Sequence, residues 1–185
     1  MALTENQDVP LGSPCPDFRL PTVDGGVAAR DDFRDRPVLC VLFICNHCPY
    51  VQAIEDRVIA LAAEYGPRGV QLVGICSNDP VAYPDDAPSR LLARWTEKAY
   101  GFPYLVDAEQ TVARAFAAVC TPDIYVYGPE RRLAYHGRLD DNWKEPDKVA
   151  RRELAAAFEA LLAGGAPPTP QIPSMGCSIK WRKAS

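Results

Sequence analysis

Residues 38–49, with the sequence VLCVLFICNHCP, decide the fold of this chain. The run over 38–44 is apolar at every position, which predicts a strand buried on both faces of a covered sheet. Beyond Cys48 the apolar residues recur at the spacing of one helical face: they are Val51, Ile54, Val58, Leu61, Ala62 and Tyr65. The Cys45-x-x-Cys48 pair therefore lies where a buried strand passes into a helix.

This position suits thiol chemistry. A cysteine in the first turn of a helix faces unpaired backbone N–H groups and the positive end of the helix dipole, and both favour thiolate over thiol. Two cysteines three residues apart can also close into a disulfide ring and reopen. The placement of Cys45 and Cys48 therefore predicts a redox site. A structural zinc site is the other interpretation, but it requires four ligands, and the sequence holds no second Cys-x-x-Cys.

The composition is that of an ordinary globular protein. With 185 residues, of which 48% are hydrophobic, the chain is long enough for one domain with a real core. A net charge of −4 argues against a nucleic-acid partner. The N-terminus lacks the features of a secretion signal, and no apolar run approaches the ~20 residues that span a bilayer. We therefore expect a cytoplasmic protein without a membrane partner. The high count of seven cysteines favours redox or metal chemistry over structural disulfides, although Cys15, Cys40 and Cys76 are expected to be structural thiols.

The remaining elements predict an α/β domain. A strand over 70–76 follows the first helix (46–65), and this succession predicts a right-handed parallel crossover. The other predicted elements are a hairpin of strands at 18–20 and 27–29, a helix beginning at Ser89, an extended segment at 102–106, a helix over 108–119, antiparallel strands at 124–127 and 132–136, and a last helix over 147–163. We expect a single domain over 10–185, a flexible N-terminus at 1–9 and an irregular, Pro-rich C-terminal tail at 164–185.

This order of elements resembles the thioredoxin fold, a central mixed sheet flanked by helices. Cys45-x-x-Cys48 stands at the end of the first long strand, and Thr121-Pro122 stands before the second hairpin, as in that fold. The N-terminal hairpin and the long insert after 70–76 resemble the peroxiredoxin (AhpC/TSA-related) and TlpA-like branch. Three runs, CNHCPYV at 45–51, DDNW at 140–143 and PSMGCSIKW at 173–181, are similar to a bacterial group of peroxiredoxin-like proteins of the thioredoxin family. The resemblance covers nearly the whole chain from about residue 10.

The resemblance implies roles for the residues at and near the motif. Cys45 would be the exposed nucleophile with a low pKa, and Cys48 the resolving thiol. His47, as an imidazolium, would stabilise the Cys45 thiolate and make the site a better oxidant; a solvent-exposed histidine of small effect is the alternative. Pro122 would be a cis-proline, with the backbone of Thr121 offering hydrogen bonds to a substrate strand. The alternative is an ordinary proline that opens an edge strand.

Three further residues are candidates for the same site. Asp79 resembles the acid that TlpA-like proteins carry after the strand at 70–76, whereas the buried aspartate of thioredoxin is replaced here by Leu39. Asp79 would receive the proton of the resolving cysteine, unless it only forms a turn. If Cys120 and Cys177 both approach the motif, the site has four thiols and a disulfide relay to the tail becomes possible. Otherwise Cys120 packs as a small hydrophobic residue and Cys177 anchors the tail.

The predicted activity is thiol–disulfide exchange through Cys45 and Cys48. The expected partners are a protein or small-molecule disulfide as substrate and a recycling reductant of the thioredoxin or glutathione type. An antioxidant thiol peroxidase is the first alternative, because Cys48-Pro49 matches the Cys-Pro step of peroxiredoxins, although the Thr of their P-x-x-x-T-x-x-C motif is missing. A metal-binding chaperone using Cys45, Cys48 and Cys177 is the second. We expect no organic cofactor, because no Gly-rich dinucleotide loop follows a strand.

Overall fold

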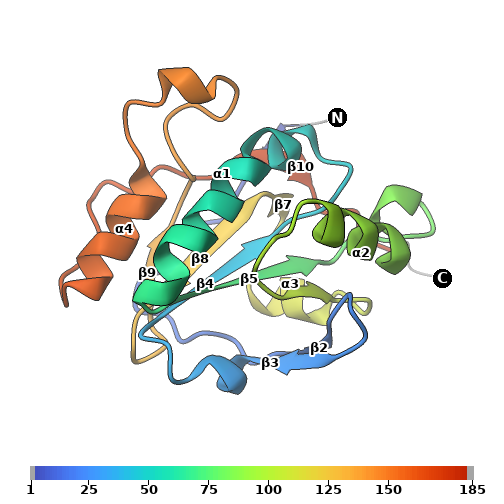
Figure 1. The fold of residues 1–185 in the computed structure, drawn as a ribbon, viewed down its shortest axis with the longest axis horizontal. Helices are drawn as coiled ribbons and strands as arrows, with labels where there is room; N and C mark the ends of the chain where they lie inside the picture. The colour runs from blue at the N-terminus through green and yellow to red at the C-terminus, as the bar shows by residue number, and fades with distance from the viewer. Residues whose placement is uncertain (1–2, 183–185) are drawn as a thin grey trace.

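A five-stranded mixed sheet with the strand order β6-β5-β4-β8-β9 forms the centre of the computed structural model, which describes residues 3–182 (Figure 1). Its strands are β4 (Val38–Phe43), β5 (Val70–Cys76), β6 (Tyr104–Val106), β8 (Asp123–Tyr127) and β9 (Leu133–His136). β4 pairs in parallel with β5 and antiparallel with β8, so the strand that leads into the cysteine motif is the middle one. All six residues of β4 are buried, as its apolar run predicts.

Alternate side chains of β4 enter two separate hydrophobic clusters. The helices are α1 (Pro49–Tyr65), α2 (Pro88–Glu97), α3 (Thr111–Ala115) and α4 (Glu153–Leu162). Val38, Cys40 and Leu42 pack with α1 and α4, while the intervening side chains pack with α3 and the hairpin of β2 (Arg19–Pro21) and β3 (Val27–Ala29). Figure 1 shows α1 and α4 in front of the sheet. Because successive side chains of a strand point to opposite faces, an entirely apolar strand requires both faces to be covered.

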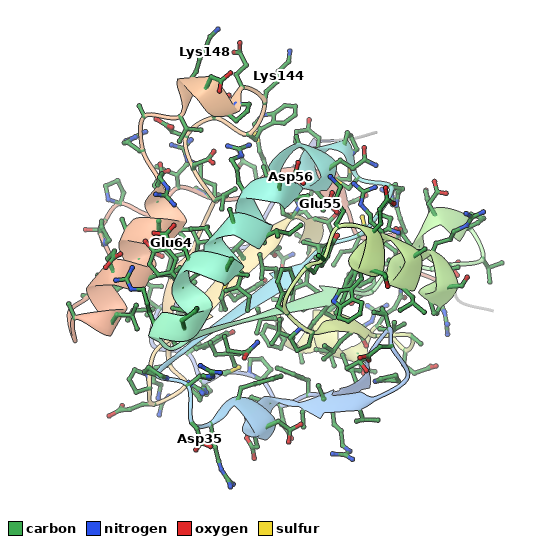
Figure 2. The ribbon with its side chains drawn as sticks, in the orientation of Figure 1. Asp35, Glu55, Asp56, Glu64, Lys144 and Lys148 are labelled. Carbon is green, nitrogen blue, oxygen red and sulfur yellow. The ribbon has the colours of Figure 1, made fainter. Side chains whose placement is uncertain are left out.

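The helix that carries the motif is joined to α2 by a buried ion pair. Glu55 lies on the side of α1 that faces α2 (Figure 2), and only 4% of it is exposed. Its two carboxylate oxygens accept hydrogen bonds from Arg94 at 2.6 and 2.7 Å, and one of them also accepts from the Tyr100 hydroxyl at 2.5 Å. A buried charge is tolerated only with such partners. The contact therefore fixes α2, and the loop before it, against α1.

The two ends of the described chain meet in a second sheet with the order β1-β10-β7, in which both pairings are antiparallel. These strands are β1 (Leu3–Glu5), β7 (Cys120–Thr121) and β10 (Met175–Ser178). The expected flexible segment at 1–9 and irregular tail at 164–185 are thereby corrected at residues 3–5 and 175–178; residues 1–2 and 183–185 lie outside the described part. Strands of two to four residues are too short to show a period of two in the sequence.

The predicted N-terminal hairpin, parallel crossover and mixed sheet flanked by helices are confirmed, with shorter helices than expected. α1 begins at Pro49, α3 spans 111–115, and α4 begins at Glu153. The described part of the chain also contains four 3₁₀ turns: Arg30–Phe33, Gly66–Arg68, Pro84–Asp86 and Pro146–Lys148. The last of these takes the first turn of the predicted final helix. Within residues 3–182, no helix combines the length and the hydrophobicity that crossing a bilayer requires.

Candidate active site

The two cysteines of the motif lie in the short link between β4 and α1. Cys48 is the N-cap residue of α1, with an extended backbone (φ −79°, ψ 118°), and Pro49 opens the helix. Proline is favoured at that position because it has no N–H group to leave unpaired. Cys45 is 2% exposed and Cys48 is fully buried. The expected exposure of Cys45 is therefore not found, because the loop of Asp86 and the strand β10 close over the motif.

Thr121 contacts both motif cysteines, and its peptide bond to Pro122 is cis, as expected. Cys45 Sγ lies 3.4 Å from the Thr121 hydroxyl oxygen, and in its neutral form Cys48 donates a hydrogen bond to the Thr121 carbonyl at 3.1 Å. The backbone of Thr121 is not open to a substrate strand, however. β10 pairs with it, so that Cys177 stands opposite Thr121. The chain itself occupies the predicted docking edge.

The structure brings Cys177 to the motif and places Cys120 behind it. Cys48 is hydrogen-bonded to both Cys45 and Cys177, and Cys177 is 1% exposed. Cys120 donates instead to the Pro122 carbonyl at 3.7 Å, and burial raises the pKa of its thiol. All seven cysteines lie within residues 3–182, and none of them is in a disulfide. The site is thus a hydrogen-bonded row of three thiols with a fourth beside it.

The surroundings favour a thiolate at Cys48 rather than at Cys45. The hydrogen bond from Cys45 lowers the pKa of Cys48 to about 5; burial opposes this, and hydrogen bonds from the first turn of α1, Thr121 and Cys177 assist it. Burial, the hydrogen bond with Cys48 and the charge of Asp86 raise the pKa of Cys45 well above its usual value. The expected order, with the low pKa at Cys45, is reversed. The physical reason is that the hydrogen bond from Cys45 stabilises a thiolate at Cys48, while burial disfavours one at Cys45. The first turn of α1 and the charge of Asp86 act in the same direction.

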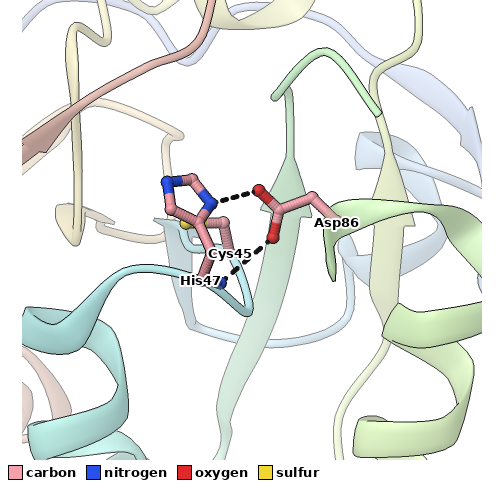
Figure 3. A group of neighbouring side chains, drawn as sticks. All are labelled: Cys45, His47 and Asp86. Carbon is pink, nitrogen blue, oxygen red and sulfur yellow. Dashed lines mark hydrogen bonds and ion pairs between the residues drawn. The ribbon is translucent and has the colours of Figure 1, made fainter. Parts of the chain in front are cut away.

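Asp86 fastens the motif from the loop between β5 and α2 (Figure 3). Its Oδ1 accepts hydrogen bonds from the backbone N–H groups of Asn46 at 2.7 Å and His47 at 3.3 Å. Its Oδ2 lies 2.5 Å from His47 Nδ1 and accepts from Asn78 Nδ2 at 2.8 Å. Burial opposes ionisation of Asp86, but the hydrogen bonds from His47 and Asn78 outweigh it and hold its pKa below the usual range. His47 accordingly points at Asp86, and its ring stacks on Tyr83.

Asp79, the acid expected beside the cysteines, makes local contacts instead. Its Oδ1 accepts from the Val81 N–H at 3.1 Å, and its own N–H donates to the Lys180 carbonyl at 2.9 Å. Asp86, from the same loop, takes the buried place at the motif. The sequence did not single out Asp86, because the loop holds three aspartates and no pattern in the sequence shows which of them lies beside the cysteines. The 3₁₀ turn at Pro84–Asp86 decides which of them faces inward.

One group of side chains in the described part of the chain could hold a metal ion. Cys45 Sγ, a His47 ring nitrogen and an Asp86 oxygen all lie within 4.8 Å of one another (Figure 3). This set differs from the predicted one of Cys45, Cys48 and Cys177. It offers three protein ligands, one fewer than a structural zinc site, and His47 Nδ1 is already bonded to Asp86. The arrangement therefore fits thiol redox chemistry better than a closed zinc centre.

A cavity of about 250 Å³ adjoins the site. Tyr50, Pro122, Trp143 and Met175 are among its lining residues, and the rings of Tyr50 and Trp143 lie 4.4 Å apart. Trp143 and Met175 are partly exposed, so the cavity has a largely apolar wall that reaches the surface. It lies next to the cis-proline loop that contacts Cys48.

Comparisons with known proteins agree with this architecture. The family described as "AhpC/TSA family" matches residues 11–136. The chain belongs to the AhpC/TSA family. Among curated proteins no match is found. The crystal structure of a hypothetical protein from Sinorhizobium meliloti 1021 is 41% identical over 98% of this chain and 100% of that one, with a TM-score of 0.94.

Two structures of proteins with described functions share the fold at lower identity. Peroxidoxin BcpB from Mycobacterium tuberculosis is 19% identical over 83% of this chain and 96% of that one, with a TM-score of 0.60. A secreted disulfide oxidoreductase of M. tuberculosis, homologous to E. coli DsbE, is 16% identical over 63% of this chain and 79% of that one, with a TM-score of 0.54. The predicted thioredoxin-like fold and peroxiredoxin-like family are confirmed. Membership of the AhpC/TSA family supports a redox enzyme in general terms.

Proposed function

We propose that this AhpC/TSA-family protein is a thiol–disulfide oxidoreductase that uses Cys45 and Cys48 as its redox pair. The observation that carries the proposal is the hydrogen-bonded, buried pair of Cys45 and Cys48 at the start of α1, with Thr121 in contact with both sulfur atoms. The hydrogen bond from Cys45 lowers the pKa of Cys48, and burial raises the pKa of Cys45. The thiolate is the nucleophile of disulfide exchange, and a neighbouring thiol is needed to release the product.

The roles follow from the protonation states. The Cys48 thiolate attacks one sulfur of a substrate disulfide, the substrate S–S bond breaks, and the first product leaves as a thiolate that takes up a proton. Cys45 then loses its proton and attacks Cys48 Sγ, which forms the Cys45–Cys48 disulfide and releases the second product thiol. Two electrons pass from the dithiol to the substrate. A reductant of the thioredoxin or glutathione type would restore the dithiol.

The low pKa of Cys48 also bears on the working direction. A hydrogen-bonded thiolate stabilises the reduced form of the pair relative to the disulfide, which raises the reduction potential. We therefore expect a potential above that of thioredoxin, about −270 mV, and a site that accepts electrons more readily.

The test is a redox titration of the full chain with reduced and oxidised glutathione, followed by acid quenching, alkylation and peptide mass mapping. The expected result is a Cys45–Cys48 disulfide that forms and reopens reversibly. Cys40→Ser is the matched control, because Cys40 is fully buried in β4 and burial alone raises its pKa. A pair that stays reduced at every glutathione ratio, in both proteins, would overturn the proposal.

A thiol peroxidase is the second candidate, and the burial of Cys48 favours it. A thiolate that is fully buried and followed by Pro49 is easier to reach for a peroxide than for a protein disulfide. The test is hydrogen peroxide consumption by the Cys45→Ser/Cys177→Ser variant, with trapping of sulfenic acid at Cys48, because a remaining Cys177 thiol would convert the sulfenic acid to a disulfide. Sulfenic acid at Cys48 together with peroxide consumption would favour this candidate; an unmodified Cys48 would exclude it.

A further inference from the structure

The strand β10 occupies the edge at which the chain of an external substrate would pair. It runs antiparallel to β7, with Cys177 opposite Thr121 and Ser178 opposite Cys120. A Cβ atom on Gly176 would lie 1.9 Å from the Thr121 carbonyl oxygen, so the two backbones approach more closely than any side chain at that position would allow. β10 thus lies against the cis-proline loop as a bound peptide strand would.

Cys177 is the residue of β10 that meets the reactive cysteine. It is hydrogen-bonded to Cys48, and burial followed by that hydrogen bond raises its pKa to about 12. Cys177 is therefore a thiol beside a thiolate, which is the arrangement that Cys45 also has. Cys48 stands between two thiols, one from its own motif and one from the tail.

We propose that β10 is a built-in substrate strand and that Cys177 is a second disulfide partner of Cys48. The inference rests on the proposed function in one respect, because it requires a reactive Cys48. In the oxidised protein the Cys177 thiolate attacks Cys48 Sγ of the Cys45–Cys48 disulfide. The Cys48–Cys177 bond forms, the Cys45–Cys48 bond breaks, and Cys45 leaves with the electron pair and takes up the proton that Cys177 lost. The number of disulfides is unchanged, so the step needs no further oxidant.

The same strand restricts access to the site. A chain from another protein can pair with Thr121 only after β10 has left it, because one edge of β7 cannot bind two strands. Release of β10 also removes Cys177 from Cys48. The position of β10 therefore decides two things together. With β10 in place, Cys48 has Cys177 as an internal disulfide partner and the site excludes a substrate chain; with β10 released, the site admits a substrate chain and Cys48 loses that partner.

The first experiment maps disulfides in the full chain carrying Cys45→Ser, oxidised with oxidised glutathione. Cys48 first forms a mixed disulfide with glutathione, and Cys177 then displaces the glutathione. The expected main product is a Cys48–Cys177 disulfide. Two double variants serve as matched controls. C45S/C177S should stop at glutathionylated Cys48, because it lacks the second thiol. C45S/C120S should form the same disulfide as C45S, because Cys120 donates its hydrogen bond to the Pro122 carbonyl and not to Cys48.

Glutathionylated Cys48 as the final product of C45S would overturn the proposal, as would loss of the internal disulfide in C45S/C120S. Failure of the proposed function has a different signature: a Cys177→Ser chain, which cannot pass its disulfide to the tail, would then form no Cys45–Cys48 disulfide, whatever C45S does. The two results come from separate proteins, each with its own disulfide map.

The second experiment tests access. Gly176→Ala places a methyl group against the Thr121 backbone and should separate β10 from β7, whereas Gly66→Ala makes the same change where nothing lies within 4 Å. In the reduced proteins, iodoacetamide should label Cys48 of G176A roughly tenfold faster or more than in wild type or G66A, because the closed state is lost. Circular dichroism confirms that each variant is folded. A folded G176A that labels at the wild-type rate would contradict the proposal.

Discussion

Replacing Cys45 by alanine should raise the pKa of Cys48. The hydrogen bond from Cys45 is the largest influence that lowers this pKa to about 5. A hydrogen bond to a charged group contributes about 1.5–3 kcal/mol, and one pKa unit corresponds to about 1.4 kcal/mol, so we expect a rise of roughly one to two units. The Cys48 pKa in C45A should therefore fall at roughly 6 to 7.

The assay is the ultraviolet absorbance of the thiolate, followed against pH in the reduced protein. Absorbance reports Cys48 alone below about pH 9, because burial and neighbours raise the pKa of the other six cysteines. Absorbance also avoids the limited access of reagents to a buried sulfur. In the wild type the transition should be centred near pH 5.

Two variants serve as controls for the same measurement. Cys177→Ala also removes a hydrogen bond to Cys48, but a weaker influence, and should give a smaller rise. Cys40 lies away from the motif, so Cys40→Ala should leave the pKa of Cys48 unchanged. A Cys48 transition that stays near pH 5 in C45A, or moves lower, would refute the view that the hydrogen bond from Cys45 stabilises the Cys48 thiolate.

Three further predictions concern stability, measured by urea unfolding of the reduced protein. Folding lowers the pKa of Cys48, so its thiolate contributes to the free energy of unfolding. This contribution is complete above the unfolded-state pKa near 9 and is lost as the pH falls towards about 5. In Cys48→Ser, the free energy of unfolding should therefore lack this dependence on pH. Asp86→Ala leaves two backbone N–H groups and a buried amide without an acceptor and should cost about 3–5 kcal/mol, whereas an effect as large from Asp79→Ala would show that the loop is fastened elsewhere. Arg94→Ala leaves the buried Glu55 carboxylate without its main partner and should also cost about 3–5 kcal/mol. Lys98 is a half-buried second cation 3.8 Å from the same carboxylate, so Lys98→Ala should cost less, and equal losses in the two variants would contradict this reasoning.

The parts of the fold that sequence predicts well are those with a local signal. The strand over 38–43 is long enough to be recognised from its apolar run, and the helix after it from its apolar stripe. The junction between the two elements gives the position of Cys45 and Cys48. The cis-proline before the second hairpin could be placed from its motif and the order of elements. These features need no knowledge of distant contacts.

The parts that sequence could not supply depend on contacts between distant segments. Asp86 and Asp79 belong to the same loop, and only the packing of a 3₁₀ turn against the motif separates them. Cys177 lies in a four-residue strand whose partner, β7, has two residues, so its register with Thr121 leaves no pattern in the sequence. The order of the pKa values at Cys45 and Cys48 depends on both of these contacts.

The position of β10 between β1 and β7 has a consequence for biosynthesis. A ribosome adds about 5–20 residues per second, so on the order of ten seconds pass between the synthesis of Cys48 and that of Cys177. During this time the motif can be present on the growing chain while the strand that covers it is not, and β1, which precedes the other described strands, still lacks the neighbour with which it pairs. Until residues 175–178 have been added, the growing chain therefore lacks the strand that pairs with Thr121 and brings Cys177 to Cys48, and only the loop of Asp86 can cover the thiol pair.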